Sequence, residues 1–503
     1  MTKTADIIVV GSGNAALCAA IAALEKGADV LVIEKGDEAL AGGNSKYTAG
    51  AMRFVYNSNN DLMPLLKNPD DRRLSNTDFG SYTADKFRSD LLGFNDGRDL
   101  SVEQNILIDH SYETMLWLAE NGIKFEPIYE RQSFEKDGRF VFWGGLTLCA
   151  DGEGVGLVDA ELEVFLKKGG RIKYNCAGIE LITDQGKVVG IRVEDKDGNQ
   201  DELFAGSIIL GSGGFEASPE LRKKYIGSDW DQAKVRGTPL NTGQGLKMAL
   251  DLGASEYGFY QGCHATPMDL HMKDFGNLEI PHFERKNYRK ICYFLGIMLN
   301  ANGERFVDEG IDFRNYTYAQ FGRAIIEQPG HFAWQIFDAK TDDLLYGEYT
   351  FHDAHFVEAD TLDALVEKLD GIENKQQALQ TIEDFNSAVD QNTPFDPTIK
   401  DGKGTSGLEL AKSNWAQSFD QAPYKAYPVT CGITFTYGGL KVNEQGNVLK
   451  ENGDVIEGLF ACGELVGGVF FNGYPGGSGL TSGAVFGRRA GYGAAQSIKQ
   501  EHA

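Results

Sequence analysis

The chain has 503 residues, which corresponds to about three domain-sized units of roughly 150 residues each. Its 73 Asp and Glu residues outnumber its 48 Lys and Arg residues, so the formal net charge is −25 and argues against general binding to nucleic acids or anionic membranes. Hydrophobic residues make up 42% of the chain, which excludes a disordered protein. Glycine is in excess, at 62 residues, so we expect glycines with specific structural roles.

The sequence shows no signal for export, for membrane insertion or for a metal site. Residues 1–6 lead directly into an apolar segment, without the basic region and cleavage site of a signal peptide. No run of about 18 apolar residues predicts a transmembrane segment. The seven cysteines are scattered, without a C-x-x-C pair, which argues against disulfides, an iron–sulfur cluster or an attached haem. We therefore expect a cytoplasmic protein with plain buried cysteines and no metal.

The first segment of the chain carries a dinucleotide-binding pattern. Residues 6–10 predict a strand, residues 11–16 (Gly-Ser-Gly-Asn-Ala-Ala) open a helix, and residues 30–33 predict a second strand that ends at Glu34. Gly11 permits the tight turn, Gly13 lets the backbone approach a pyrophosphate, and Ala16 takes the third glycine position. The helix N-terminus offers its N–H groups to the phosphates, and Glu34 can accept a hydrogen bond from a ribose hydroxyl.

Two further glycine-rich segments complete the predicted site. The loop at residues 41–50 follows Glu34 and is placed to hold the diphosphate and the flavin ring. Near the other end of the chain, residues 458–464 predict a short buried strand, and the glycine-rich run at 472–483 leads into a helix from about Ala484. A site built from both ends of the chain favours FAD over NAD, whose fingerprint normally lies in one contiguous domain. The residues expected to contact the cofactor are Gly11, Gly13, Asn14, Ala15, Ala16, Glu34, Lys35, Gly42, Gly43, Asn44, Ser45, Thr48, Ala49, Gly50, Gly213, Gly463, Glu464, Gly479, Leu480 and Thr481.

These motifs, together with residues 210–215, 303–309 and 461–464, resemble the flavoprotein family of fumarate reductase and succinate dehydrogenase over almost the whole chain. Within that family, residues 13–20, 308–318 and 474–481 look like the tricarballylate dehydrogenases. The resemblance implies an α/β fold with a Rossmann-like FAD-binding domain, residues 1–258 and 433–503. It also implies an inserted α+β capping domain, residues 259–432, which covers the substrate. The FAD is expected to be non-covalent, because the flavin-linking histidine of the membrane enzymes is absent around Asn44.

The resemblance also implies the catalytic residues. His264 matches the family histidine that binds a substrate carboxylate, and Arg314 matches the arginine proposed to carry the proton, at a spacing one residue longer. Where fumarate reductases have a second histidine and a carboxylate-binding arginine, this chain has Phe435 and Tyr474. A small dianion needs cations at each end, so these departures argue against fumarate or succinate as the substrate.

Other residues remain open as candidates. Tyr474 and the loop that contains Gly477 are similar to the ketone-binding tyrosine and loop of ketosteroid dehydrogenases. Tyr437, Tyr474 and Tyr316 are alternative proton carriers, because a guanidinium normally stays protonated. Arg53 is a further candidate for a substrate carboxylate. The structural alternatives are a core histidine for His264, a salt bridge for Arg314 and a solvated loop charge for Arg53.

The expected function is an FAD enzyme that oxidises or reduces a carbon–carbon bond next to a carboxylate, with tricarballylate to cis-aconitate as the first candidate reaction. One alternative is a fumarate reductase-like or ketosteroid dehydrogenase-like enzyme that acts on another enoate or enone. A flavin-dependent redox sensor or electron carrier is the non-enzymatic alternative. The expected partners are a small carboxylate or enone substrate and an electron donor or acceptor that the sequence does not identify.

Overall fold

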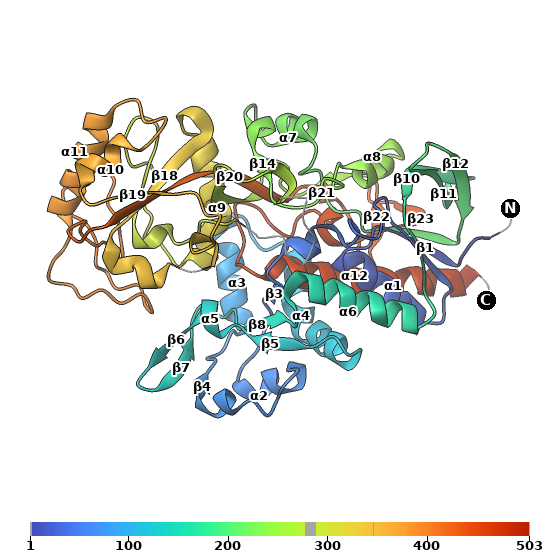
Figure 1. Cartoon of the computed structure of the whole chain (residues 1–503). Coiled ribbons are helices and arrows are strands. Elements are labelled where there is room, and N and C mark those ends of the chain that lie inside the picture. Colours follow the sequence, from blue (N-terminus) through green and yellow to red (C-terminus); the bar gives the residue numbers. More distant parts are fainter. Residues whose placement is uncertain (1–2, 277–287, 346, 502–503) are drawn as a thin grey trace.

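The computed structural model describes residues 3–276, 288–345 and 347–501 (Figure 1). One part of the molecule is built on a six-stranded sheet in the order β22-β23-β13-β1-β2-β9, in which only β22 runs antiparallel to its neighbour. The strands are β1 (Ile7–Val10), β2 (Val30–Ile33), β9 (Arg171–Lys173), β13 (Ser207–Leu210), β22 (Asn447–Leu449) and β23 (Val455–Ala461). Buried apolar runs such as β1 and β2 are typical of a parallel sheet that is covered on both faces.

Two helices from opposite ends of the chain, α1 (Asn14–Glu25) and α12 (Ser478–Glu501), lie along each other and pack against this sheet (Figure 1). α6 (Glu153–Lys167) packs on α1, and α4 (Val102–Glu120) packs on α12. Glycines at a spacing of four residues make this packing possible: a Cβ atom at Gly487 would lie 2.3 Å from the Ala15 carbonyl oxygen, and one at Gly491 would lie 2.1 Å from that of Ala19. Part of the glycine excess is therefore explained by helix packing.

The glycines that precede residue 484 account for an error in the predicted helix start. The sequence predicts a loop as far as residue 483, because glycine disfavours helix, but α12 already begins at Ser478. Gly479, Leu480 and Thr481 therefore belong to the first helical turn. The predicted strands near residues 6–10 and 30–33 are confirmed.

A second sheet forms the other part of the molecule, on the left in Figure 1. It contains β14 (Lys234–Val235), β16 (Cys263–Asp269), β17 (Ile297–Leu299), β18 (Phe332–Phe337), β19 (Val357–Ala359) and β20 (Tyr424–Thr436). Its helices are α9 (Arg314–Ile326), α10 (Leu362–Glu367) and α11 (Lys375–Ala388). The long strand β20 pairs with β14, β16, β18 and β19.

This part has a hydrophobic core of its own, which includes Ile297, Trp334, Leu365 and Phe385. However, β14 pairs with β20 although it lies in the segment assigned to the FAD-binding domain. The domain boundaries at 258/259 and 432/433 stay a prediction.

Smaller elements fill the remaining surface. The strands are β3 (Ala51–Met52), β4 (Thr77–Asp78), β5 (Phe125–Pro127), β6 (Ser133–Lys136), β7 (Arg139–Phe142), β8 (Leu148–Ala150), β10 (Cys176–Asp184), β11 (Lys187–Asp195), β12 (Gln200–Phe204), β15 (Glu256–Tyr257) and β21 (Gly439–Leu440). The helices are α2 (Asn59–Leu62), α3 (Ala84–Leu92), α5 (Tyr129–Gln132), α7 (Pro219–Tyr225) and α8 (Gln244–Asp251). All seven cysteines are buried and free, as the sequence predicts. Within the described ranges, no helix has the length and apolar character to cross a membrane.

Candidate active site

A cavity of about 430 Å³ lies where the carboxyl ends of β1, β2 and β13 meet β16 and β20 of the second sheet. Ligands of open α/β sheets bind at this edge of the strands. Most of the sequence-predicted residues line it, namely Gly11, Gly13, Asn14, Ala15, Glu34, Lys35, Gly43, Asn44, Ser45, Thr48, Ala49, Gly213, Gly463, Glu464, Gly479, Leu480, His264, Arg314, Tyr437, Tyr474 and Gly477. Ala16, Gly42, Gly50, Thr481 and Arg53 do not contribute to its wall.

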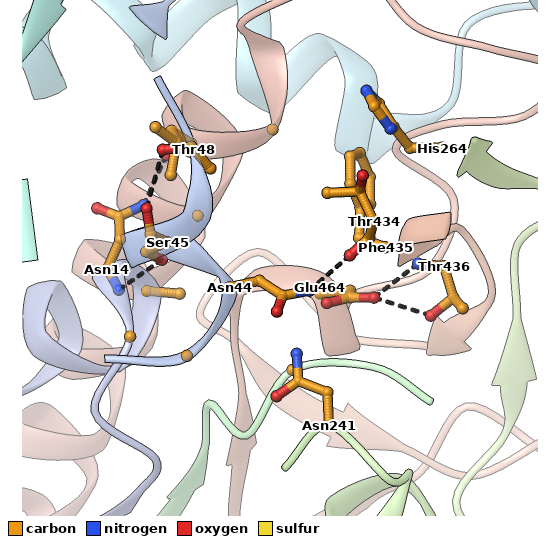
Figure 2. Close-up of a pocket in the computed structure, with 18 of the residues that line it drawn as sticks. Asn14, Asn44, Ser45, Thr48, Asn241, His264, Thr434, Phe435, Thr436 and Glu464 are labelled. Carbon is orange, nitrogen blue, oxygen red and sulfur yellow. Dashed lines mark hydrogen bonds between the residues drawn. The ribbon is translucent and has the colours of Figure 1, made fainter. Parts of the chain in front are cut away.

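The turn between β1 and α1 is shaped to admit a phosphate group. Gly11 has a φ of 104°, and a Cβ atom there would lie 2.6 Å from the Gly211 carbonyl oxygen, so only glycine fits. Gly13 caps α1, and the Asn14 N–H donates to the Ser45 hydroxyl at 3.1 Å (Figure 2). The buried Ser212 hydroxyl lines the same cavity and has no partner among the described residues. These groups fit the pyrophosphate of a bound dinucleotide.

Glu34 lies at the end of β2, where the ribose is expected. Its carboxylate accepts hydrogen bonds from the Ser12 hydroxyl and, at 2.7 Å, from the Gly36 N–H. Burial raises the pKa of this carboxyl group, and the two hydrogen bonds oppose that shift. Because a carboxylate oxygen can accept more than one hydrogen bond, Glu34 can still receive a ribose hydroxyl.

The carboxyl groups of Glu464 and Glu216 fix the end of β20 beside the residues expected to hold the cofactor. We call these residues, which include Gly11, Gly13, Glu34 and Ser45, the cofactor cradle. Glu464 Oε1 accepts from the Thr436 N–H at 2.6 Å, and the Asn44 side chain donates to the Thr434 carbonyl oxygen at 2.5 Å (Figure 2). Asn44 also donates to Glu216 at 2.6 Å. Burial, followed by the neighbouring Glu464, raises the pKa of Glu216. The bonds at 434 and 436 hold Phe435 between them.

Aromatic rings form the wall that faces this cradle. His264 on β16 is the cross-strand partner of Phe435 on β20, and their rings stack with centroids 5.2 Å apart. The His264 ring also meets Tyr318 and Tyr474 edge-on, at 5.0 and 5.1 Å. Burial and then Arg236 lower the pKa of His264 well below its usual range, so the imidazole is neutral at physiological pH. Its Nδ1 atom has no partner among the described residues.

The tyrosines of this wall stay protonated. The hydroxyl groups of Tyr318 and Tyr474 lie 2.5 Å apart, and burial raises the pKa of both. Burial likewise raises the pKa of Tyr437, whose buried hydroxyl has no partner among the described residues. The sequence motifs missed Tyr318, although it follows Arg314 by one helical turn on α9 and shares its face.

Arg314 and Arg53, the two arginines predicted from the sequence, differ in their position relative to the cavity. Arg314 lines the cavity, donates to the Arg131 carbonyl oxygen at 2.5 Å and lies 5.3 Å from the Trp143 ring centre. Arg53 lies behind the wall and is fully buried. It donates to the carbonyl oxygens of Gly476 and Gly144, each at 2.7 Å. These contacts support the Gly476 loop, and the sequence-based assignment of Arg53 to a substrate carboxylate stays a prediction.

Two further arginines, Arg236 and Arg289, line the cavity and were missed by sequence reasoning. Arg236 follows the two-residue strand β14, and Arg289 forms an isolated bridge with Met268. Neither position belongs to a recognisable motif. Their proximity to His264 depends on the pairing of segments that are distant in sequence.

The fold and the cavity define a dinucleotide-binding protein. Residues 6–480 match the family described as FAD binding domain, and the chain belongs to that family. It is 27% identical to the NADH:acrylate oxidoreductase of Vibrio harveyi, over 99% of this chain and 51% of that protein. It is also 27% identical to a fumarate reductase (cytochrome) of Shewanella frigidimarina, over 99% of this chain and 78% of that protein. The chain thus spans about half of the first relative and about three quarters of the second.

Solved structures show the same fold. The 3-ketosteroid Δ1-dehydrogenase of Sterolibacterium denitrificans superposes with a TM-score of 0.73 at 21% identity, covering 99% of this chain and 100% of that one. A flavocytochrome c3 fumarate reductase in its open conformation gives 0.71 at 24% identity, covering 99% and 79%. These likenesses confirm the predicted fold. Membership of the family confirms the predicted FAD-binding domain, and the two curated relatives named above are an oxidoreductase and a reductase.

Proposed function

We propose that this protein oxidises or reduces a carbon–carbon bond conjugated to a carboxylate or carbonyl group. The observation that carries the proposal is one continuous cavity, lined by the dinucleotide cradle and by the wall of His264, Phe435 and Tyr474. Bound FAD supplies the hydride chemistry at its N5 atom. The named relatives that reduce acrylate and fumarate support this class of reaction.

The residues that would hold FAD are those of the cradle, with Gly11, Gly13 and Ser45 at the phosphates and Glu34 at the ribose. Glu464 and Asn44 would fix the cradle to β20. We propose non-covalent binding, because residues 42–46 include no histidine, cysteine or tyrosine to form a link. A cytoplasmic location stays a prediction.

The chain's own contribution is to orient the substrate and to supply a proton. The hydroxyl groups of Tyr318 and Tyr474 share one hydrogen bond, so the group that accepts this bond still has its own proton to donate. Tyr474 lines the cavity. In the direction of reduction, we place the proton for the α carbon on the Tyr474 hydroxyl oxygen, with Tyr318 as its hydrogen-bond partner. In the direction of oxidation, the α carbon loses this proton, and the deprotonated Tyr474 oxygen would have to accept it. The Arg314 guanidinium, held against the Arg131 carbonyl oxygen, stabilises negative charge as it develops on the substrate.

Tricarballylate, oxidised to cis-aconitate, is the first candidate substrate. The motifs at residues 308–318 and 474–481 favour it, and so do three arginines on the cavity wall, Arg236, Arg289 and Arg314. A polycarboxylate needs several cations to offset the overall charge of −25.

A monocarboxylic enoate or a neutral enone is the second candidate. It is favoured by the rings of Phe435, Phe470 and Tyr474, which surround the site with apolar surface and pack at centroid distances of 5.2–5.9 Å. A planar unsaturated substrate would lie against these rings.

An anaerobic experiment separates the candidates. Tricarballylate is added to oxidised FAD-loaded protein, and cis-aconitate to chemically reduced protein, while the flavin absorbance is followed. Bleaching by tricarballylate and recovery with cis-aconitate are expected for the first candidate. No bleaching, together with recovery on addition of an aryl acrylate or a steroid enone, would favour the second. Protein that responds to neither the acids nor the enones would contradict the proposed function.

A further inference from the structure

Asn14 lies where the first turns of two helices meet. It is the first residue of α1, is buried and lines the cavity. Its backbone N–H donates to the Ser45 hydroxyl at 3.1 Å (Figure 2), and its side-chain Nδ2 donates to the Leu480 carbonyl oxygen at 2.8 Å. Leu480 belongs to the first turn of α12 and lines the same cavity. Asn14 therefore joins the starts of α1 and α12 at the cavity wall.

A thiol and a carboxyl group lie behind Asn14. Cys18, one helical turn further along α1, is fully buried, and its Sγ lies 3.6 Å from Asn14 Oδ1. The same sulfur atom lies 3.5 Å from Oε1 of Glu161, a fully buried residue on α6. The other oxygen of Glu161, Oε2, is buried and has no partner in the described part of the chain. Neither Cys18 nor Glu161 lines the cavity, so they can act on its occupant only through Asn14.

The thiol of Cys18 has one proton for two acceptors. Burial, followed by Glu161, raises the pKa of Cys18 well above its usual range, so the thiol keeps this proton. While the carboxyl group of Glu161 is neutral, it and the Asn14 amide oxygen are both uncharged acceptors and can share the proton. An ionised carboxylate is the stronger acceptor, because a charge-assisted hydrogen bond is roughly twice as strong as a neutral one. Ionisation of Glu161 would therefore draw the thiol proton away from Asn14.

The surroundings of Glu161 favour its neutral form. Burial raises the pKa of this carboxyl group, and the hydrogen bond with Cys18 is the one influence that opposes the shift. The elements that pack against α6 are α1, residues 43–47 and β8. The titratable residues on these elements are Cys18, Glu25, Lys46, Tyr47 and Cys149, and Lys46 is paired with Asp159 at 3.1 Å. Behind Cys18, the charged or titratable residues within electrostatic range are Cys462 and Arg488. Of all these residues only Cys18 shifts the pKa of Glu161, so no cation offsets the cost of burying a carboxylate there.

We propose that Glu161 controls how tightly FAD is held. In its neutral form it leaves the thiol proton of Cys18 available to Asn14, and in its ionised form it withdraws that proton. The inference rests on the proposed binding of FAD and adds a means of regulating it. Without the bond from Cys18, the amide of Asn14 is free to turn away from Leu480, so the starts of α1 and α12 are held less firmly around the cofactor.

The direction of the pH dependence follows from this arrangement. FAD binds more tightly to the form of the protein that carries the proton, so its affinity is highest at low pH and falls as the pH rises and Glu161 ionises. The fall should be about threefold to tenfold, which is the range expected for the loss of one neutral hydrogen bond.

The test measures the dissociation constant of FAD by fluorescence titration of the apoprotein from about pH 6 to about pH 9. In wild type the constant should rise by about threefold to tenfold over this range. Glu161→Gln cannot ionise and should bind FAD tightly at every pH. Cys18→Ala removes the donor to Asn14, so it should bind FAD about threefold to tenfold more weakly than wild type at low pH and show no pH dependence. Glu163→Gln, at an exposed position on the same helix, is the matched control and should follow wild type.

The pH profile separates this role from a purely structural one. A variant that is merely loosened would bind FAD more weakly at every pH and keep the wild-type dependence. An affinity of wild type that does not change with pH, or the same dependence in Glu161→Gln as in wild type, would overturn the inference. So would wild-type affinity at low pH in Cys18→Ala.

These measurements follow binding alone, so they are independent of the proposed reaction. If the inference is overturned, the proposed function stands as long as a conjugated acid or enone reoxidises the reduced flavin. Conversely, the expected pH profile in protein whose flavin responds to no enoate or enone would refute the proposed reaction and keep the control of FAD binding by Glu161.

Discussion

The hydroxyl oxygens of Tyr318 and Tyr474 lie 2.5 Å apart, and the ring of His264 meets both tyrosines edge-on. Tyr318 lies on α9, which packs against β16 and β20 of the second sheet. Tyr474 precedes α12, which packs against the six-stranded sheet that contains β1. The hydrogen bond therefore joins the two parts of the molecule at the site where the substrate is proposed to bind. Burial keeps both phenols protonated, so they act as hydrogen-bond donors and acids.

Removing the Tyr474 hydroxyl should reduce turnover without loss of FAD. Because a positioned acid contributes about 10²–10⁴-fold to a rate, we expect Tyr474→Phe to lower kcat within that range. Tyr318→Phe should have a smaller effect, since it removes only the partner. Tyr492→Phe is the control, because it loses a comparable hydrogen bond, 2.8 Å to Glu25, away from the cavity. Equal kcat values in Tyr474→Phe and wild type would contradict the assignment.

The turn at Gly11 should be essential for cofactor binding. Gly11→Ala places a methyl group against the Gly211 carbonyl oxygen and forces a non-glycine residue to a φ of 104°. Gly253→Ala is matched in backbone strain, with a φ of 82°, but has open space around the new methyl group. We expect Gly11→Ala to lower FAD affinity by at least about tenfold, which corresponds to about 1.4 kcal/mol, and Gly253→Ala to leave it unchanged. The flavin-to-protein absorbance ratio after purification measures the difference.

Arg53 should prove to be structural. Replacing it with Gln removes the hydrogen bonds to Gly144 and Gly476 and leaves the carbonyl group of the buried Gly476 without this donor, at a cost of about 1–3 kcal/mol. Thermal unfolding of Arg53→Gln should therefore occur at a clearly lower temperature. Anaerobic reoxidation of the reduced flavin by a conjugated acid should persist in the folded variant. A variant of wild-type stability that has lost this reoxidation would favour Arg53 as a substrate-binding residue.

Buried Glu161 on α6 should make stability fall as pH rises. Its Oε1 accepts a hydrogen bond from Cys18 at 3.5 Å, and burial raises its pKa well above the ordinary 4.5. Between these two pKa values the folded protein binds the extra proton, so the free energy of unfolding decreases with pH, by at most about 1.4 kcal/mol per pH unit.

Glu161→Gln removes this titration and should raise the unfolding temperature relative to wild type, with a gap that widens from pH 5 to pH 8. The exposed Glu163→Gln on the same helix is the control and should follow wild type. A gap that stays constant or narrows as pH rises would show that Glu161 is ionised in the folded protein.

The residues expected to bind the dinucleotide could be predicted from the sequence, because the patterns that mark them lie close together along the chain. The β1–α1 turn and Glu34 lie within about 30 residues in a pattern that one βαβ unit imposes. The start of α12 was misplaced because glycines that serve close helix packing look the same, in sequence, as glycines of a loop.

The substrate half was less visible. Arg236 reaches the cavity only because β14 pairs with β20, almost 200 residues away, and no local pattern records that pairing. Tyr318 could have been found, since it lies four residues after Arg314, which is about one turn of a helix. The burial of Arg53 against backbone carbonyl groups could not be predicted, because an arginine that binds backbone carbonyls has no distinguishing sequence signal.

The most direct measurement is the anaerobic reoxidation of chemically reduced, FAD-loaded protein by unsaturated compounds. The panel pairs conjugated acids, such as acrylate, cis-aconitate and cinnamate, with an enone and with alkenoic acids whose double bond is isolated from the carboxylate. We expect one equivalent of at least one conjugated acid to restore the oxidised flavin spectrum, and the isolated alkenes to have no effect. A protein that is reoxidised by none of the conjugated compounds, or equally well by the isolated alkenes, would contradict the proposed reaction.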